Sequence, residues 1–229
     1  MNYDLMIETF PRLLSGASLT IQLVLISLFI GFCLAVGLAQ LRLSSIPPLK
    51  FFARSYVFYF RGTPLLVQIF LIYYGIGQFE TIRESFLWTF FKEPYWCGIL
   101  ALTLNTCAYT SEIIRGGIQS VPFGQIESAR SIGMSGILLY RRIILPIAFR
   151  QALPAYGNEM ILMVKASSLV STITLMEITG IAKLTIARTF SPVEIFLAAG
   201  SIYLTINFII TRLVHYFEMK LTPYLQHGK

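Results

Sequence analysis

The sequence predicts an all-α integral membrane protein with five transmembrane helices, its N-terminus outside and its C-terminus in the cytoplasm. Two observations lead to this prediction. First, 55% of the 229 residues are hydrophobic and only 13% are charged, whereas charged residues make up about a quarter of an average soluble domain. Second, the few charges lie between apolar tracts that are long enough to cross a bilayer, and the basic residues gather in alternate loops.

Five tracts have the length and the low charge that a membrane span requires, which is about 20 mostly apolar residues. They cover residues 18–41, 55–79, 94–113, 155–176 and 193–213. No low-complexity segment, internal repeat or domain linker separates them. The chain is therefore predicted to form a single transmembrane domain over residues 1–229.

The distribution of lysine and arginine sets the predicted orientation, because cytoplasmic loops are enriched in these residues. With the N-terminus outside, the cytoplasmic segments contain Arg42, Lys50, Arg54, Arg115, Arg130, Arg141, Arg142, Arg150, Arg212, Lys220 and Lys229. The outer segments then contain only Arg12, Arg83, Lys92, Lys183 and Arg188. This excess favours the N-outside, C-inside arrangement.

The longest predicted cytoplasmic segment, residues 115–152, contains a pattern for two helices joined by a glycine turn. In the first helix Ser120 is a candidate N-cap, Pro122 suits the first turn, and Gly133 suits a left-handed position after the helix. A second helix is expected from Ser135, with a break or kink at Pro146. A plain connection needs only about 4 to 6 residues, so the length of this segment favours a docking surface over a solvated linker.

A spaced motif within this segment resembles the signature of membrane subunits of bacterial ABC importers. Glu127, Ser128, Ala129, Gly133, Ile143, Leu145 and Pro146 match the pattern E-A-A, three residues, G, nine residues, I-x-L-P, with serine in place of one alanine. The stretches "RGTPLLVQIFLIYYG", "LALTLNTCAYTSEI", "LPAYGNEMILMVKASSL" and "STITLMEITG" are similar to importers of polar amino acids, so the resemblance covers nearly the whole chain. The arginine and the histidine/lysine/arginine/ornithine permeases look most similar, and opine permeases of the same family stay open as an alternative.

The resemblance implies a fold, a location and a set of partners. The fold is the type I ABC importer transmembrane domain, as a multi-pass protein of the bacterial inner membrane. The partners are an ATPase dimer at the cytoplasmic face, a second permease subunit, like or unlike, and a periplasmic or lipid-anchored binding protein. The substrate is a polar, basic amino acid such as arginine, histidine, lysine or ornithine. The helix that docks on the ATPase is expected to include Gln125, Glu127, Ser128, Ala129, Arg130 and Gly133.

The residues themselves give no sign of a nucleotide, metal or catalytic site. There is no G-x-x-x-x-G-K-[ST] motif for a phosphate loop, no H-E-x-x-H motif and no Ser/His/Asp set. The three cysteines have neither metal-ligand spacing nor an even number for disulfides. The basic residues are not interleaved with aromatic residues, which argues against nucleic-acid binding. We therefore expect no cofactor on this chain, with Mg-ATP held by the partner ATPase.

Candidate residues for the substrate pathway are polar or ionisable residues at membrane depth, which are costly there and usually face a cavity or a partner. They are Arg61, Asn105, Tyr109, Glu112, Glu159 and Lys165. Asn105, Tyr109 and Glu112 share one helix face, beside a break expected at Gly62–Pro64, as in the discontinuous helices of transporters.

Each candidate also has a structural alternative. Arg61 can pair with a nearby carboxylate, and Glu112 can lie at the membrane surface. Glu159 can form a hydrogen bond between helices, and Lys165 can pair with Glu159 or with a partner subunit. The polar stripe of the third span can simply join helices. For the whole chain, the alternatives are a secondary transporter, which would more often show internal repeats, and a membrane enzyme, which lacks a catalytic set.

Overall fold

The computed structural model describes residues 3–221, and these residues fold into helices without any β-strand. The α-helices are α1 (Tyr3–Leu43), α2 (Pro47–Gly62), α3 (Leu65–Phe70), α4 (Glu80–Arg83), α5 (Trp88–Phe91), α6 (Pro94–Gln119), α7 (Phe123–Ser131), α8 (Gly136–Leu139), α9 (Leu145–Ser167), α10 (Ile178–Thr189) and α11 (Pro192–Leu221). Two π-helical segments, η1 (Leu71–Gly75) and η3 (Tyr140–Ile144), and two 3₁₀ segments, η2 (Ile76–Gln78) and η4 (Ser168–Ile173), complete the described chain. Lys229, which the orientation prediction counts, lies outside the described residues.

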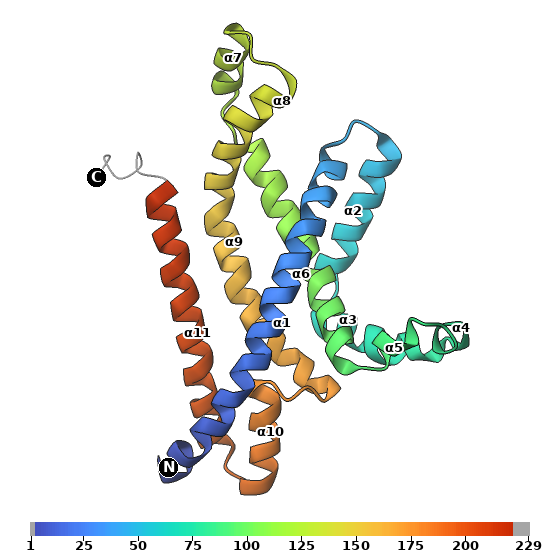
Figure 1. Cartoon of the computed structure of the whole chain (residues 1–229), viewed down its shortest axis with the longest axis vertical. Coiled ribbons are helices and arrows are strands. Elements are labelled where there is room, and N and C mark those ends of the chain that lie inside the picture. Colours follow the sequence, from blue (N-terminus) through green and yellow to red (C-terminus); the bar gives the residue numbers. More distant parts are fainter. Residues whose placement is uncertain (1–2, 222–229) are drawn as a thin grey trace.

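Three of these helices, α1, α6 and α11, are long and apolar enough to cross a membrane by themselves. Two bent pairs raise the number of candidate spans to five if each pair counts as one. The first pair, α2 with the helical stretch 65–78, bends by 105°, and the second, the helical stretch 136–173 with α10, bends by 50°. Helix α1 begins and α11 ends toward opposite ends of the long axis, as an odd number of spans requires (Figure 1).

All five predicted spans differ from the helices. Helix α9 begins at Leu145 rather than at residue 155, and α11 ends at Leu221 rather than at residue 213. The range 55–79 falls on two helices, because the chain breaks between Gly62 and Leu65. The first helix begins at Tyr3 rather than near residue 18, and at 41 residues it is longer than a bilayer core of about 30 Å requires. The third extends to Gln119. Helix propensity continues past the apolar tract in both cases, so hydropathy alone underestimates their length.

The residues on either side of α7 and α8 also bear on two local predictions. Ser120 ends α6 and donates its hydroxyl to the Gly117 carbonyl at 2.7 Å, so it does not cap α7, which follows Pro122 instead. Pro146 does not break its helix, because the π-helical segment η3 directly precedes it. The alternative, a kink at this residue, stays a prediction. A proline leaves the carbonyl four residues earlier without an N–H partner, and a widened turn accommodates that loss without ending the helix.

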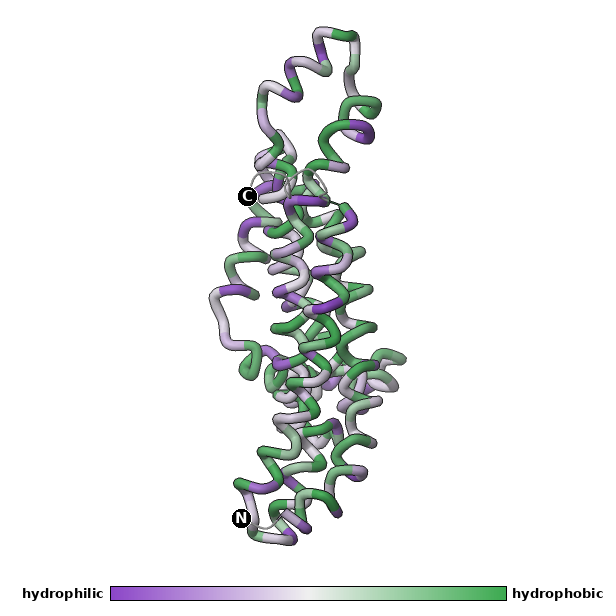
Figure 2. The backbone as a smooth tube through the Cα atoms, turned by 90° about the vertical axis from the view of Figure 1, so that its left-hand side faces the viewer, coloured by the Kyte–Doolittle hydropathy of each residue, from purple (hydrophilic) through white to green (hydrophobic). Residues whose placement is uncertain are grey.

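Helices α1, α6 and α9 form the centre of the bundle, and α11 packs along α9 and α1 (Figure 1). Hydrophobic residues predominate through the middle of the long axis (Figure 2). The largest core cluster includes Leu23, Ile69, Leu102, Met163 and Ile173, all buried. Large apolar side chains such as Phe29, Phe58 and Leu204 are more than two-thirds exposed. A hydrophobic exterior around a hydrophobic core is the pattern expected when the solvent is lipid.

A buried carboxylate fixes α10 against α1 and α11. Glu177 is fully buried, and its side chain caps α10 by accepting the Gly180 N–H at 2.8 Å. The Tyr203 hydroxyl of α11 donates to the same carboxylate at 2.6 Å, and Thr20 of α1 lies 3.5 Å from it. Since a buried carboxylate needs several partners, this network ties three helices together where the fourth predicted span, 155–176, gives way to α10.

Small residues let α6 and α9 approach closely, as is common where membrane helices pack. A Cβ atom added at Gly117 would lie 2.7 Å from the Ala148 carbonyl oxygen and 3.0 Å from the Ala152 Cβ. The neighbouring Gly116 has open space around the same position. Substitutions at these two neighbouring glycines therefore distinguish the effect of close helix packing from the effect of helix propensity.

We expect Gly117→Ala to lower the thermal unfolding midpoint in detergent, because overpacking costs roughly 1 to 3 kcal/mol. Gly116→Ala should leave the midpoint unchanged or raise it slightly, since alanine favours helix over glycine. Equal midpoints for the two variants would show that α6 and α9 do not pack as closely as described.

Candidate functional site

The break between α2 and α3 creates an unpaired carbonyl group that the surrounding side chains satisfy. Pro64 has no N–H to donate to the Phe60 carbonyl, which would be its partner in a continuous helix. Instead, the side-chain amide of Gln68 donates to this carbonyl at 2.9 Å, and that of Asn105 donates to it at 3.3 Å. Gln68 also donates to the Thr63 hydroxyl at 2.8 Å and accepts from Asn105 at 3.0 Å. Asn105 is therefore a brace for the broken helix.

We expect Asn105→Leu to lower the thermal unfolding midpoint in detergent by several degrees. The variant leaves buried polar groups of Gln68 and Phe60 with fewer partners, and an unsatisfied buried group costs roughly 1 to 3 kcal/mol. Gln78→Leu is the control, because Gln78 is exposed and bonds only to Tyr74 of its own helical stretch. A midpoint for Asn105→Leu equal to that of the control would exclude the bracing role.

A cavity of about 420 Å³ lies beside this break, between α3, α6 and the end of α9. It is lined by Leu65, Asn105, Tyr109, Glu159, Leu162, Met163, Lys165, Ala166, Ser168 and Leu169. Four of the six predicted pathway residues thus meet in one space, although they come from different helices. The walls are mainly apolar with a few polar groups, which is the usual make-up of a small-molecule site.

Glu159 is the only acidic residue that lines this cavity within the described chain. It is 5% exposed, and its Oε1 atom accepts a hydrogen bond from the Thr106 hydroxyl at 2.8 Å. The hydrogen bond joins α9 to α6, as the structural alternative for Glu159 predicts. Among residues 3–221, no side chain or backbone group donates to the second carboxylate oxygen, so the group can both join helices and offer negative charge to the cavity.

Lys165 lies near the end of α9, where it is exposed and lines the same cavity. No ion pair joins it to Glu159 among residues 3–221. The suggested Lys165–Glu159 pair is therefore not present, whereas pairing with another subunit stays a prediction. The cavity thus contains one carboxylate and one ammonium group from the same helix.

Arg61 and Glu112 lie outside the cavity lining, next to its Tyr109 wall. The Arg61 guanidinium lies over the Tyr109 ring, 5.1 Å from the ring centroid. Its Nη1 atom is 3.9 Å from the Glu112 carboxylate. Arg61 thus pairs with a nearby carboxylate, as its structural alternative predicts, and it connects the cavity with a neighbouring charge cluster.

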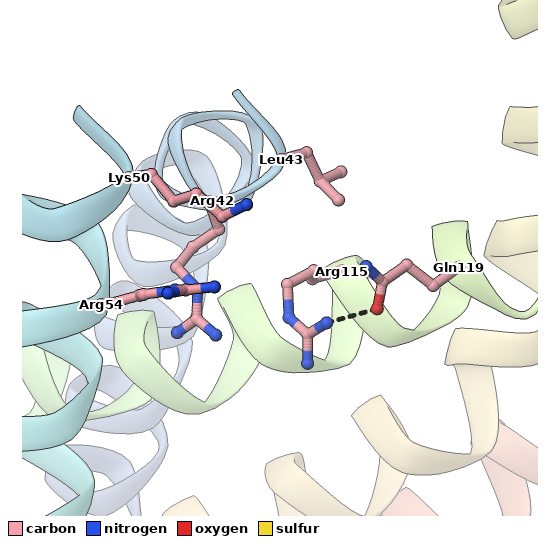
Figure 3. Close-up of a pocket in the computed structure, with 6 residues that line it drawn as sticks. All are labelled: Arg42, Leu43, Lys50, Arg54, Arg115 and Gln119. Atoms are coloured by element: carbon pink, nitrogen blue, oxygen red, sulfur yellow. Dashed lines mark hydrogen bonds between the residues drawn. The ribbon is translucent and has the colours of Figure 1, made fainter. Parts of the chain in front are cut away.

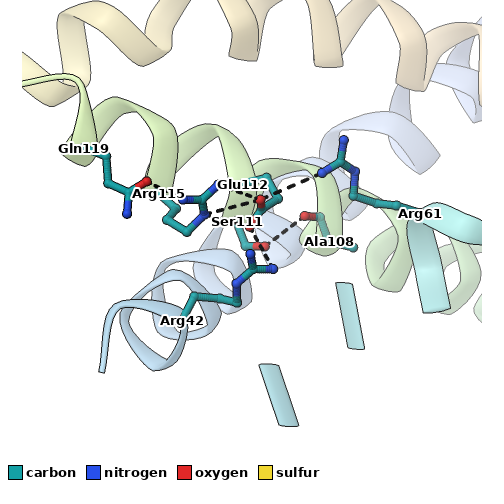
Figure 4. Close-up of polar contacts among 7 residues, drawn as sticks. All are labelled: Arg42, Arg61, Ala108, Ser111, Glu112, Arg115 and Gln119. Atoms are coloured by element: carbon teal, nitrogen blue, oxygen red, sulfur yellow. Dashed lines mark hydrogen bonds and ion pairs between the residues drawn. The ribbon is translucent and has the colours of Figure 1, made fainter. Parts of the chain in front are cut away.

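Glu112 is the centre of that cluster and pairs with three arginines from three helices (Figure 4). Its carboxylate lies 3.0 Å from Arg42 of α1 and 2.9 Å from Arg115 of α6, in addition to Arg61 of α2. Arg115 also donates to the Gln119 side chain. One carboxylate therefore holds the ends of α1, α2 and α6 together, and a direct role in substrate binding stays a prediction.

The predicted docking helix corresponds to α7, which lies at the far tip of the molecule with α8 (Figure 1). Gln125, Glu127, Ser128 and Arg130 are exposed, whereas Ala129 is 4% exposed and faces the rest of the chain. Phe123, Ile132 and Ile137 are between 67% and 85% exposed at the same tip. A small polar helix surrounded by exposed apolar side chains is a surface suited to a protein partner.

Gly133 ends α7 in a left-handed conformation, as its position in the motif predicts, with φ of +87°. The Gly133 N–H donates to the Arg130 carbonyl at 2.9 Å, and the Met134 N–H donates to the Ala129 carbonyl at 3.0 Å. This pair of hydrogen bonds is a Schellman motif, which favours glycine at the left-handed position. Gly136, the first residue of α8, is also left-handed, with φ of +50°, and the sequence reasoning missed it.

Sequence reasoning also missed Gln68 and Thr106, which hold Asn105 and Glu159 in place. Both are uncharged polar residues inside apolar tracts. That property is itself a signal, because a polar side chain in a membrane span needs a partner. The sequence reasoning therefore found one residue of each contact, Asn105 and Glu159, but not its partner.

Comparisons with known proteins agree with this architecture. Residues 24–223 match the family model of the binding-protein-dependent transport system inner membrane component. The nopaline transport system permease protein of Agrobacterium fabrum is 56% identical over 227 residues, covering 99% of this chain and 94% of its own length. The octopine transport system permease protein of Rhizobium meliloti is 57% identical, covering 94% and 88%. The arginine ABC transporter permease protein of Escherichia coli K12 is 42% identical, covering 94% and 96%.

Solved structures show the same fold. A crystal structure of an amino acid ABC transporter with histidines matches with a TM-score of 0.86 and 35% identity, covering 96% of this chain and 99% of that chain. An inward-facing methionine ABC transporter matches with a TM-score of 0.76 at 16% identity, covering 94% and 98%, and this likeness concerns the fold alone. The predicted all-helical type I ABC permease fold is thus confirmed. The chain belongs to the family of binding-protein-dependent transport system inner membrane components and is a permease subunit, not an enzyme, with ATP hydrolysis assigned to a separate subunit.

Proposed function

We propose that this chain is the membrane-spanning permease subunit of an ATP-driven importer for opines. The observation that supports this substrate class is the difference in identity among its relatives. Permeases named for nopaline and octopine are 55–57% identical to this chain, whereas those named for arginine and for histidine, lysine, arginine and ornithine are 42–43% identical. This preference reverses the order that the sequence alone suggests, in which basic amino acids come first.

Uptake of basic amino acids is the second candidate, and the Glu159 carboxylate favours it. A buried carboxylate with a free oxygen in a mostly apolar cavity is a suitable partner for a cationic side chain. The same carboxylate would also suit any opine with a cationic group. The cavity chemistry therefore supports a cationic polar substrate without separating the two classes.

The importer is proposed to comprise two permease subunits, an ATPase dimer and a solute-binding protein that delivers the substrate from outside. The exposed α7–α8 tip supports the ATPase contact, because a short helix on a fixed turn can transmit a rigid-body movement. The excess of basic residues in the segments on the α7 side supports placing that tip in the cytoplasm of a bacterial inner membrane. Closure of the ATPases would then shift the cavity between outward and inward access.

A competition assay tests the substrate class. The chain is co-expressed with the second permease subunit, the ATPase and the binding protein of its importer, and the complex is reconstituted into vesicles. Uptake of labelled nopaline is measured with unlabelled octopine, arginine, histidine, lysine or ornithine as competitors. We expect ATP-dependent uptake in which octopine competes better than arginine. Preferential competition by arginine would favour the second candidate, and uptake without ATP would overturn both in favour of a secondary carrier.

A further inference from the structure

A basic pocket of about 180 Å³ lies between the α1–α2 turn and the end of α6 (Figure 3). Its lining residues are Arg42, Leu43, Lys50, Arg54, Arg115 and Gln119. Figure 3 shows the Arg42, Arg54 and Arg115 side chains directed into the same space. The volume is several times the roughly 10 to 15 Å³ that one water requires, so the pocket has room for a polyatomic group.

The positive charge of this pocket exceeds the negative charge available to it. Glu112 is shared among Arg42, Arg115 and Arg61. Among residues 3–221, no ion pair involves Lys50 or Arg54. Glu112 thus holds two guanidinium groups at the back of the pocket, while Lys50 and Arg54 add charge at its α2 side. Like charges gathered in one pocket repel each other, and an anion placed among them relieves that repulsion.

Apolar side chains adjoin the basic ones along α2. Phe51 and Phe52 lie between Lys50 and Arg54 in sequence and are 73% and 62% exposed. The α1–α2 turn lies short of the α7–α8 tip along the long axis, closer to the middle of the bundle (Figure 1). A basic pocket with the apolar residue Leu43 in its wall, on a helix whose other faces expose aromatic rings, suits an anionic headgroup with acyl chains attached. A free phosphate ion would gain nothing from these apolar side chains.

We propose that this pocket binds the phosphate of an anionic phospholipid from the cytoplasmic leaflet. The proposal rests on the N-outside orientation proposed above and concerns a site separate from the substrate cavity. Arg42 and Arg115, oriented by Glu112, contact the phosphate, and Lys50 and Arg54 close the pocket from α2. The bound lipid joins the turn between α1 and α2 to the end of α6, from which the α7–α8 tip continues.

The experiment measures lipid binding to the full-length chain in detergent by native mass spectrometry. The probes are phosphatidylglycerol, zwitterionic phosphatidylcholine and inorganic phosphate. We expect retained phosphatidylglycerol at concentrations where phosphatidylcholine is not retained. Lys50→Ala/Arg54→Ala should weaken phosphatidylglycerol binding about 30-fold, because each basic residue near an anionic lipid contributes roughly fivefold. These two residues make no ion pair that folding would lose.

Two controls keep the result specific. Arg212→Ala/Lys220→Ala removes the same charge from exposed positions of α11 on the same side of the membrane, and it should bind phosphatidylglycerol like the wild type. Arg54→Lys preserves the charge and should retain binding. Equal retention of phosphatidylcholine, or equal weakening by the α11 variant, would overturn the proposal. Displacement of phosphatidylglycerol by an equal concentration of inorganic phosphate would assign the pocket to free phosphate instead.

Discussion

Gly133→Val is expected to lower coupled uptake strongly while leaving membrane insertion intact. Gly133 has a φ of +87°, and a side chain in the left-handed region costs roughly 1 to 2 kcal/mol, or more when it is β-branched. The variant should therefore open the Schellman motif that ends α7 and change the angle between α7 and α8. Uptake should fall about tenfold or more, since each 1.4 kcal/mol is a factor of ten, and ATP hydrolysis in the reconstituted complex should no longer respond to substrate.

The matched control for this prediction is Gly124→Val, in the first turn of the same helix. Gly124 does not have a positive φ, and a side chain added there meets open space. It removes a glycine from α7 without disturbing the turn, so uptake should stay close to that of the wild type. Normal coupling in Gly133→Val, or equal loss in both variants, would mean that the turn geometry does not transmit the ATPase movement.

Glu159→Gln is expected to lower uptake of a cationic substrate strongly and uptake of a neutral polar amino acid only slightly. The glutamine keeps an acceptor for the Thr106 hydroxyl, which lies 2.8 Å from the carboxylate, so the α6–α9 link survives while the charge is lost. Removing one partner of a buried charge pair costs roughly 2 to 5 kcal/mol. Uptake of arginine should therefore fall by more than tenfold, as measured by initial rates in vesicles.

Thr106→Val serves as the comparison, because it removes the hydrogen bond between helices and keeps the Glu159 charge. Its effect should be similar for cationic and neutral substrates. If Glu159→Gln lowers uptake of both classes equally, the carboxylate acts only in the fold, and the proposed role in recognition is wrong.

For Glu112, residue spacing predicts the correct helix face but not the contacts of the side chain. The spacing of Asn105, Tyr109 and Glu112 places them on one face of α6, which is correct for a helix. Only Asn105 and Tyr109 line the cavity, because three arginines from separate helices hold the Glu112 carboxylate beyond it. Two of these arginines, Arg42 and Arg61, are distant in sequence, so no local pattern reveals that they meet at one acid.

At Pro64, too, the local sequence predicts one part of the structure and the packing of distant helices decides another. Proline and glycine in "RGTP" predict a discontinuity, since proline removes a donor and glycine permits a bend. The bend of 105° and the partners of the freed Phe60 carbonyl depend on where α6 lies. The periodicity of the sequence does not show how close α6 lies to the Phe60 carbonyl.

By itself, the sequence determined the class of this protein: apolar tracts near the thickness of a bilayer, alternating basic loops, and a spaced motif with Gly133 at a left-handed turn. These features are local, because hydropathy, charge and backbone angle act on neighbouring residues. The tertiary structure alone decided which polar residues share a cavity, which acid Arg61 meets, and how Lys50, Arg54 and Arg115 form one basic pocket. Those outcomes depend on contacts between helices far apart in the chain, which packing of the whole bundle sets.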